Sequence, residues 1–251
     1  MKTVIMAGGK GTRISSVASD IPKPMIKIEG KPVLEHELEC LRDQGFTDII
    51  LTVSHLGNII MDYFGDGSGI SPVTGKPFGV HIEFYFEKEP LGNAGALFKI
   101  KDKLTSDFLL LNADAVFDVD FNRFVAFHKE HGGLVTLFTH PNSHPYDSGL
   151  IISDKNCIVE KWLAKEDERP KYYRNRVNAG LHVINPTILD HSGIDADKVG
   201  TVGENGKPIK VDLDRQLLKP LAGTGEMFCY DSPEYVKDMG TPERYYSVCE
   251  D

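Results

Sequence analysis

The first 140 residues alternate between apolar runs that favour β-strands and segments with helical periodicity. The strand-like runs cover residues 3–7, 48–53, 80–86, 108–111 and 134–138, and the helical patterns cover 33–41, 58–64, 91–100 and 121–131. Parallel neighbouring strands need long crossover connections, which helices supply, so the alternation predicts a mostly parallel sheet flanked by helices. After about residue 145, strand-like pieces at 150–152, 157–163 and 177–184 follow without regular helices between them, which predicts an antiparallel addition.

The size and charge of the chain limit its class. Its 251 residues, 41% of them hydrophobic, can bury one substantial core, and we expect a single domain with halves at about 1–145 and 146–251. A net charge of −9 disfavours wrapping nucleic acid or lying on an acidic membrane. No run reaches the roughly 18 apolar residues of a membrane span, and Met1 leads into a strand-like segment without a signal-peptide pattern. We therefore expect a cytoplasmic protein without nucleic-acid or membrane partners.

A glycine-rich loop, Gly8-Gly9-Lys10-Gly11-Thr12-Arg13, follows the first strand directly. Ligands of open parallel sheets bind beyond the carboxyl ends of the strands, so this loop predicts a phosphate site. Its glycines let main-chain amides approach an anion, and its two cations add positive charge. The GxGxxG and GxxxxGK[ST] patterns are both missing, which disfavours an NAD enzyme or a P-loop NTPase. A tight strand-to-helix turn with solvated cations is the alternative interpretation.

This loop, taken from Met6 to Arg13 together with Pro22-Lys23-Pro24-Met25, resembles the signature of sugar-1-phosphate nucleotidylyltransferases. Further matches follow in the family's order: residues 89–97, Asn112-Ala113-Asp114, Glu160-Lys161, Asn178-Ala179-Gly180 and residues 238–243. The glycine loop and residues 89–97 are most similar to guanylyltransferases acting on mannose 1-phosphate or D-glycero-D-manno-heptose 1-phosphate. The chain departs from the family at Ser15-Ser16, Asn93 and Ala113, where a Leu-x-Pro continuation, threonine and glycine are common.

The resemblance implies a Rossmann-like α/β fold, the nucleotide-diphospho-sugar transferase fold, with a nucleotide-facing first half and a sugar-phosphate-facing second half. It implies transfer of a nucleotidyl group from a nucleoside triphosphate, GTP favoured, to a sugar 1-phosphate, with release of pyrophosphate. Arg13 and Lys23 would be catalytic, acting on the leaving pyrophosphate and the α-phosphate. Asp114 and Asp238 would hold Mg²⁺, a hard cation that prefers carboxylate oxygens.

The resemblance also implies two sets of binding residues. The nucleotide set is Ala7, Gly8, Gly9, Lys10, Gly11, Thr12, Glu89, Gly92 and Asn93. The sugar-phosphate set is Asn112, Glu160, Lys161 and Asn178. Within the first set, Glu89 is the expected acceptor from a guanine edge. The acids that follow Asp114, Asp118 and Asp120, are interpreted as a solvated turn and a helix cap.

Two alternatives remain open from the residues alone. The enzyme could be a cytidylyl-, uridylyl- or thymidylyltransferase acting on another sugar phosphate. It could also be a non-catalytic nucleotide-sugar-sensing subunit, although a binding module has no use for Arg13, Lys23, Asp114 and Asp238 together. The implied role is supply of a nucleotide sugar for polysaccharide biosynthesis, and a homo-oligomer stays open.

Overall fold

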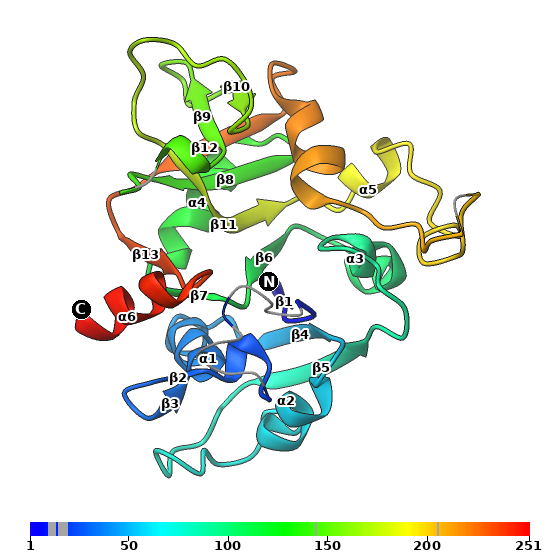
Figure 1. Ribbon diagram of the computed structural model, residues 1–251, viewed down its shortest axis with the longest axis vertical. Helices are drawn as coiled ribbons and strands as arrows, with labels where there is room; N and C mark the ends of the chain where they lie inside the picture. The colour runs from blue at the N-terminus through cyan, green and yellow to red at the C-terminus, as the bar shows by residue number, and fades with distance from the viewer. Residues whose placement is uncertain (10–13, 15–19, 144, 205) are drawn as a thin grey trace.

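The structure is a computed structural model that describes residues 1–9, 14, 20–143, 145–204 and 206–251 (Figure 1). Its centre is a nine-stranded mixed sheet with the strand order β10-β9-β11-β6-β1-β4-β5, to which β8 adds beside β11 and β12 beside β8. These strands are β1 (Lys2–Met6), β4 (Asp48–Val53), β5 (His81–Phe86), β6 (Phe108–Asn112), β8 (Val135–His140), β9 (Leu150–Ser153), β10 (Val159–Leu163), β11 (Val177–Ile184) and β12 (Met227–Asp231). Two small antiparallel sheets pair β2 (Lys27–Ile28) with β3 (Lys31–Pro32), and β7 (Ala115–Asp118) with β13 (Tyr235–Asp238).

Helices cover both faces of the large sheet. The α-helices are α1 (Val33–Asp43), α2 (Gly57–Phe64), α3 (Gly95–Lys99), α4 (Phe121–His131), α5 (Ile188–His191) and α6 (Pro242–Glu250). A π-helical segment covers Leu213–Leu218, and single 3₁₀ turns lie at Lys23–Met25, Lys101–Lys103, Pro145–Asp147 and Lys219–Leu221. Apolar side chains of α1, α2 and α4 form one core cluster, and those of α3, α5 and the π-helical segment form another. Strand side chains alternate between these two clusters, as in Leu109 and Leu111 against Leu110, so the sheet is buried on both faces.

Most elements expected from the sequence are confirmed. The bounds of β4, α4 and β11 agree with the predicted segments, and Asp120 caps α4 by accepting from the Arg123 amide at 2.9 Å. The antiparallel addition is also confirmed, because β9, β10 and β11 pair antiparallel and β11 lies antiparallel to β6. The elements beyond residue 184, including α5, α6, β12 and β13, were not expected. The single domain stays a prediction.

One predicted helix is shorter than expected. A helix was predicted over 91–100, but α3 begins only at Gly95. Gly92 has a φ of +84°, which interrupts helical geometry, and the segment instead bonds to Val211, whose amide donates to the Leu91 carbonyl at 2.8 Å. The residues before α3 therefore form a fixed loop rather than a first helical turn.

The sheet order brings the carboxyl ends of three parallel strands together. Met6 at the end of β1 pairs with Thr52 of β4 on one side and with Asn112 of β6 on the other. The loops that leave these strands, at residues 7–9, 54–56 and 113–114, therefore start side by side. A ligand site at this edge of the sheet follows from the topology.

Candidate active site

A cavity of about 880 Å³ opens at this edge and collects many of the predicted residues. The predicted residues that line it are Ala7, Gly8, Gly9, Lys23, Glu89, Gly92, Asn93, Asn112 and Asp114. They come from four loops and span more than 100 positions of the chain. Lys10, Gly11, Thr12 and Arg13 lie outside the described residues, so their roles stay predictions.

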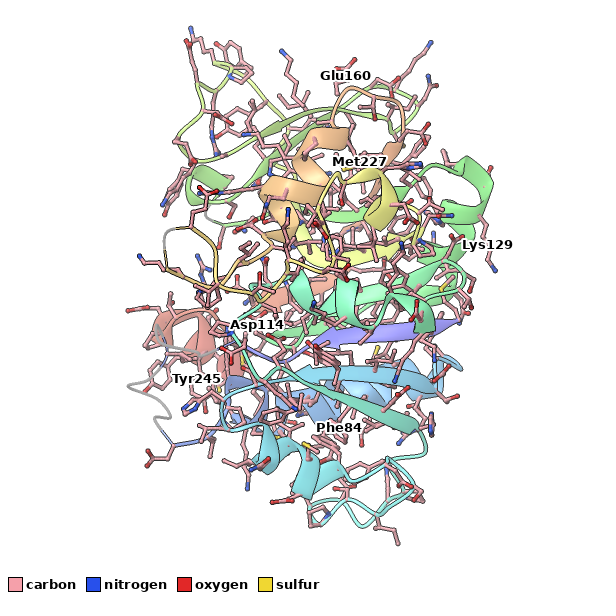
Figure 2. The ribbon with its side chains drawn as sticks, turned by 90° about the vertical axis from the view of Figure 1, so that its right-hand side faces the viewer. Phe84, Asp114, Lys129, Glu160, Met227 and Tyr245 are labelled. Atoms are coloured by element: carbon pink, nitrogen blue, oxygen red, sulfur yellow. The ribbon has the colours of Figure 1, made fainter. Side chains whose placement is uncertain are left out.

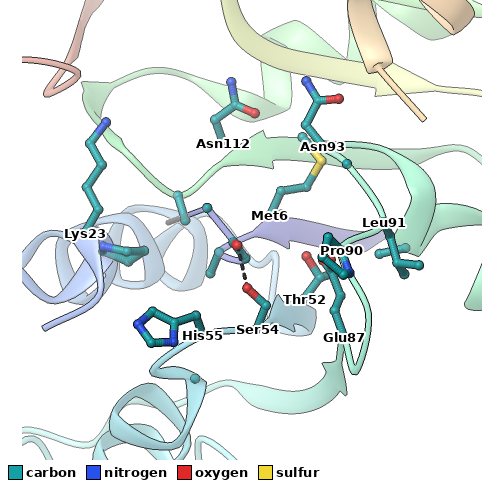
Figure 3. A pocket seen from close by; sticks show the side chains of 18 of the residues that line it. Met6, Lys23, Thr52, Ser54, His55, Glu87, Pro90, Leu91, Asn93 and Asn112 are labelled. Carbon is teal, nitrogen blue, oxygen red and sulfur yellow. Dashed lines mark hydrogen bonds between the residues drawn. The ribbon is translucent and has the colours of Figure 1, made fainter. Parts of the chain in front are cut away.

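The described part of the glycine loop is held against β4 and β5. The Ala7 amide donates to the Thr52 carbonyl at 2.9 Å, which extends the parallel ladder by one bond. The Ser54 hydroxyl donates to the Gly8 carbonyl at 2.5 Å (Figure 3). A Cβ atom on Gly8 would lie 2.8 Å from Glu87 Oε1, so a side chain at this position would displace the Glu87 carboxyl. The loop is therefore anchored at its start and packs closely on an acidic side chain.

The opposite wall of the cavity is a loop fixed by the chain near Val211. A Cβ on Gly92 would lie 2.3 Å from the Val211 carbonyl oxygen, so any side chain there displaces the loop. Asn93 Oδ1 accepts from the Leu213 amide at 2.8 Å, which leaves its amide nitrogen as the end available to a ligand. Lys210, which the motifs do not include, adds a cation to the lining.

Glu87 is a site residue that the sequence reasoning missed. Its carboxyl is partly buried beside Gly8, and burial raises its pKa to about 7, while the Leu91 amide acts in the opposite direction. Glu89, the residue predicted to meet guanine, is exposed at the rim of the same cavity. Both acids follow β5 and precede Pro90, so the sequence offers two candidates, and packing against Gly8 distinguishes Glu87 from Glu89.

Lys23 and Asp114 meet across the cavity floor. Lys23 begins a single 3₁₀ turn with Pro24 at its second position, which fixes the start of its side chain. Its ammonium donates to Asp114 Oδ2 at 2.6 Å, and the Lys23 side chain is only 10% exposed. Asp114 lies two residues after the end of β6, so an apolar strand delivers this carboxylate to the site.

Asp238 reaches Asp114 through strand pairing. The strands β7 and β13 run antiparallel with Asp238 opposite Ala115, and the Met239 amide donates to the Asp114 carbonyl at 2.9 Å. The Asp238 carboxylate accepts from Arg244 Nη1 at 2.9 and 3.1 Å and from the Gly240 amide at 2.8 Å. Asp114 lines the cavity and Asp238 does not, so a Mg²⁺ ion shared by these two carboxylates stays a prediction. Among the described residues no group of three or more His, Cys, Asp or Glu could hold a metal.

The predicted sugar-phosphate residues divide into two groups. Asn112 lines the cavity, and its side chain lies over Gly180, where a Cβ would be 2.4 Å from Asn112 Nδ2. Asn178 precedes Gly180 on the same strand but does not line the cavity. Glu160 and Lys161 lie exposed on β10, also outside the cavity lining, and Figure 2 shows Glu160 far from Asp114. The structure therefore brings Asn112 to Asp114, and it does not bring Glu160 there.

A buried acid lies beneath the site. Glu37 of α1 is only 1% exposed, so its carboxyl is removed from water. Burial raises its pKa well above the ordinary value, the charge of Asp114 adds to this, and the Ala115 amide and Lys23 oppose it. Burial therefore favours the protonated, neutral form of Glu37.

The strand order, the glycine loop and the acid at the end of β6 define a mixed α/β fold with a polar cavity at the carboxyl edge of its parallel strands. A family model described as nucleotidyl transferase matches residues 2–251, and the chain belongs to that family. A probable mannose-1-phosphate guanylyltransferase 2 of Oryza sativa subsp. japonica is 28% identical over 251 residues, covering 98% of this chain. The chain spans about 63% of the length of the curated relatives it matches.

Solved structures agree with this family. The crystal structure of HddC from Yersinia pseudotuberculosis is 28% identical, has a TM-score of 0.76, and covers 99% of this chain and 98% of that one. HddC complexed with GMP-PN matches with a TM-score of 0.75 at the same identity, again covering 99% of this chain and 98% of that one. Among the described residues, no helix has the length and apolar character required to cross a lipid bilayer.

Proposed function

We propose that this chain transfers a guanylyl group from GTP to a sugar 1-phosphate, with mannose or heptose 1-phosphate favoured, and releases pyrophosphate. A sugar-phosphate oxygen attacks the α-phosphorus, and the bond from that phosphorus to the bridging oxygen of the β-phosphate breaks. The observation that carries the proposal is the cavity itself. It joins the glycine loop, the Lys23–Asp114 pair and the Asn112 amide at one edge of the sheet.

The chemistry is one of positioning and charge neutralisation. Both substrates are polyanions, so catalysis requires cations and amide donors that bring the attacking oxygen and the α-phosphorus together in line. Lys23 is well placed for the α-phosphate, because its turn and its low exposure hold the ammonium at the cavity floor. Asp114 and Asp238 would hold Mg²⁺, which when bound neutralises the phosphate oxygens.

The preference for guanine is assigned to Glu87. The Watson–Crick edge of guanine presents the N1–H and 2-amino donors side by side, and an ionised carboxylate accepts from both. Glu87 lies in the cavity against Gly8, partly shielded from water, where such bonds are stronger than at the exposed rim position of Glu89. The similarity to guanylyltransferases and to the HddC complex with GMP-PN supports this choice of base.

An activity matrix tests the proposal. Purified protein is incubated with GTP, ATP, CTP, UTP or dTTP and with mannose, glucose or heptose 1-phosphate, and pyrophosphate release is measured with Mg²⁺ and with EDTA. We expect the highest kcat/KM with GTP, and loss of turnover in EDTA. Turnover with another nucleotide at equal or higher efficiency would favour one of the other nucleotidylyltransferases. Tight nucleotide-sugar binding without turnover for any pair would favour the sensing subunit. Action in the cytoplasm stays a prediction.

A further inference from the structure

His182 is a fully buried histidine that makes a hydrogen bond to a predicted substrate residue. It lies on β11, it is 1% exposed, and it does not line the cavity. Its Nε2 atom is 3.0 Å from Asn178 Oδ1, and the Gly180 amide donates to the same oxygen at 3.2 Å. Asn178 thus has its side-chain oxygen held by two groups of its own strand.

Gly180 links Asn178 to the cavity. The pairing of β11 with β8 shifts register between Asn178 and His182, and Gly180 has a φ of +78°, so the strand bulges here and brings the Asn178 side chain onto Gly180 and His182. His182 pairs with Leu110 and residue 181 with residue 111, so Gly180 lies beside Asn112, whose amide packs on it. Asn112 lines the cavity (Figure 3). Asn178 does not line the cavity, but its side-chain oxygen bonds to the same Gly180 on which Asn112 packs, so it lies next to the lining.

The hydrogen bonds determine which end of the Asn178 amide a ligand meets. A carbonyl oxygen has two lone pairs, and His182 and Gly180 use both. The NH₂ group of Asn178 is then the end left for a ligand, and it is a donor. For His182 to donate from Nε2, that nitrogen must carry the proton. Burial lowers the pKa of His182 to about 4, so the ring is neutral at physiological pH.

Filling a gap in the core would not require an imidazole at this position. His182 Nε2 meets the Asn178 side-chain oxygen at 3.0 Å, a polar contact that an aliphatic side chain of the same volume would not make. His128 is similarly buried at 2% exposure, yet it bonds to Thr136 and lies beside Asp107, away from the cavity lining. The difference is that the bond of His182 goes to a residue next to the site.

We propose that His182 is a positioning residue for the sugar 1-phosphate, which orients Asn178 so that its NH₂ group donates to a sugar hydroxyl. The inference rests on the proposed function and deepens it. His182 touches no substrate itself. Its effect passes through one side chain, so it acts on sugar-phosphate binding and leaves nucleotide binding unchanged.

A matched pair of variants isolates the hydrogen bond. His182→Met and His182→Gln have side chains of similar length, but only glutamine can donate to Asn178 Oδ1. We expect His182→Met to raise the KM for the sugar 1-phosphate by about tenfold, the usual effect of one lost hydrogen bond. His182→Gln should stay within about threefold of the unaltered protein. The KM for GTP and kcat should change less than about threefold in both variants.

Asn178 variants complete the test. In an Asn178→Ala background, His182→Met should cause no further rise in KM, because its route to the sugar is already removed. Asn178→Asp keeps an oxygen for His182 and Gly180 but replaces the NH₂ donor. It should therefore raise the KM for the sugar 1-phosphate at least as much as His182→Met does. Asn178→Asp also provides the test if His182→Met fails to fold, because Asn178 is less buried than His182. His128→Met is the control for loss of a buried imidazole, and it should lower thermal stability without changing either KM.

Several outcomes would overturn the inference. One is an unchanged KM for the sugar 1-phosphate in His182→Met or in Asn178→Asp. Another is an equal rise in the KM for the sugar 1-phosphate and the KM for GTP. A third is additive effects of His182→Met and Asn178→Ala in the double variant. If the unaltered protein releases no pyrophosphate with any sugar 1-phosphate, the proposed function is wrong, and this inference is wrong as well because it rests on that function. If the unaltered protein is active and the variants bind sugar phosphate normally, only the inference fails.

Discussion

Replacing Glu87 by glutamine should remove a pH dependence of GTP binding. The carboxyl lies in the cavity beside Gly8, and burial raises its pKa to about 7. Only the ionised form accepts from both the N1–H and the 2-amino group of guanine. If Glu87 reads guanine as proposed, GTP should bind in full strength only to the fraction of molecules in which Glu87 is ionised. Glutamine offers one acceptor at every pH, so the variant binds more weakly but without this dependence.

The size of the effect follows from the pKa. A group that titrates near 7 is about one-tenth ionised at pH 6 and about nine-tenths ionised at pH 8, so its ionised fraction rises about tenfold. The apparent Kd for GTP scales inversely with that fraction and should fall about tenfold over the same range. At pH 8 Glu87→Gln should raise the Kd by about tenfold or more, since a hydrogen bond to a charged group is lost.

Isothermal titration calorimetry with GTP at pH 6, 7 and 8 measures the dependence. The terminal phosphate of GTP titrates in the same range, so the informative quantity is the change in the unaltered protein relative to that in Glu87→Gln. Glu89→Gln is the matched control, because the same charge is removed two residues away at an exposed position, and it should keep the full dependence. Inosine triphosphate, which lacks the 2-amino group, should bind more weakly to the unaltered protein. Parallel pH profiles for the unaltered protein and Glu87→Gln would refute the assignment.

Four other variants test the site and its support. Asp114→Asn should abolish magnesium-dependent pyrophosphate release with an unchanged circular dichroism spectrum, and normal turnover would remove Asp114 from the metal site. Lys23→Met should lower kcat by about a hundredfold or more, measured at saturating substrates, whereas a pure KM effect would contradict a role on the α-phosphate. Gly92→Ala should destabilise the fold by about 1–3 kcal/mol in urea unfolding, because its Cβ would collide with the Val211 carbonyl; unchanged stability would contradict this. Glu37→Gln should raise the melting temperature more at pH 8 than at pH 5. Because the pKa of Glu37 is higher in the folded protein, the unfolded chain releases the proton first as pH rises, and the free energy of unfolding of the native protein falls. An equal change in melting temperature at both pH values would argue against a buried neutral acid.

Much of the fold was accessible from local patterns. Elements whose apolar residues follow one clear period, such as β4 and α4, have the predicted bounds. The error at residues 91–94 has a specific cause, since the apolar spacing there resembles a helix while the backbone is held by a segment about 120 residues later. The joining of β12 to β8 in parallel is likewise a long-range pairing that no local period encodes.

The site was predictable where one motif carries its residues and not where two segments meet. The sequence allows a choice of Lys23, which stands between two prolines, and of Asp114, which comes after an apolar strand. In the structure Lys23 Nζ lies 2.6 Å from Asp114 Oδ2. Glu87 could not be preferred to Glu89, because the preference depends on the approach of Gly8 from another strand. The contact of Arg244 with Asp238 is local, and a basic residue in the first turn of a helix that follows an acid could have suggested it.

The two proposed metal ligands each have a cation partner, and this affects how variants of the site must be interpreted. Asp114 accepts from Lys23, and Asp238 accepts from Arg244, so two adjacent carboxylates are balanced by two cations. A bound metal ion would offer positive charge to the two acids, and a bound triphosphate would offer negative charge to Lys23 and Arg244. The acids would then turn to the metal and the cations to the phosphates. Asp114→Asn therefore removes a proposed metal ligand and also the group that anchors Lys23. A titration with Mg²⁺ separates these effects, because a lost ligand raises the metal concentration required, while a displaced Lys23 lowers kcat even at saturating metal.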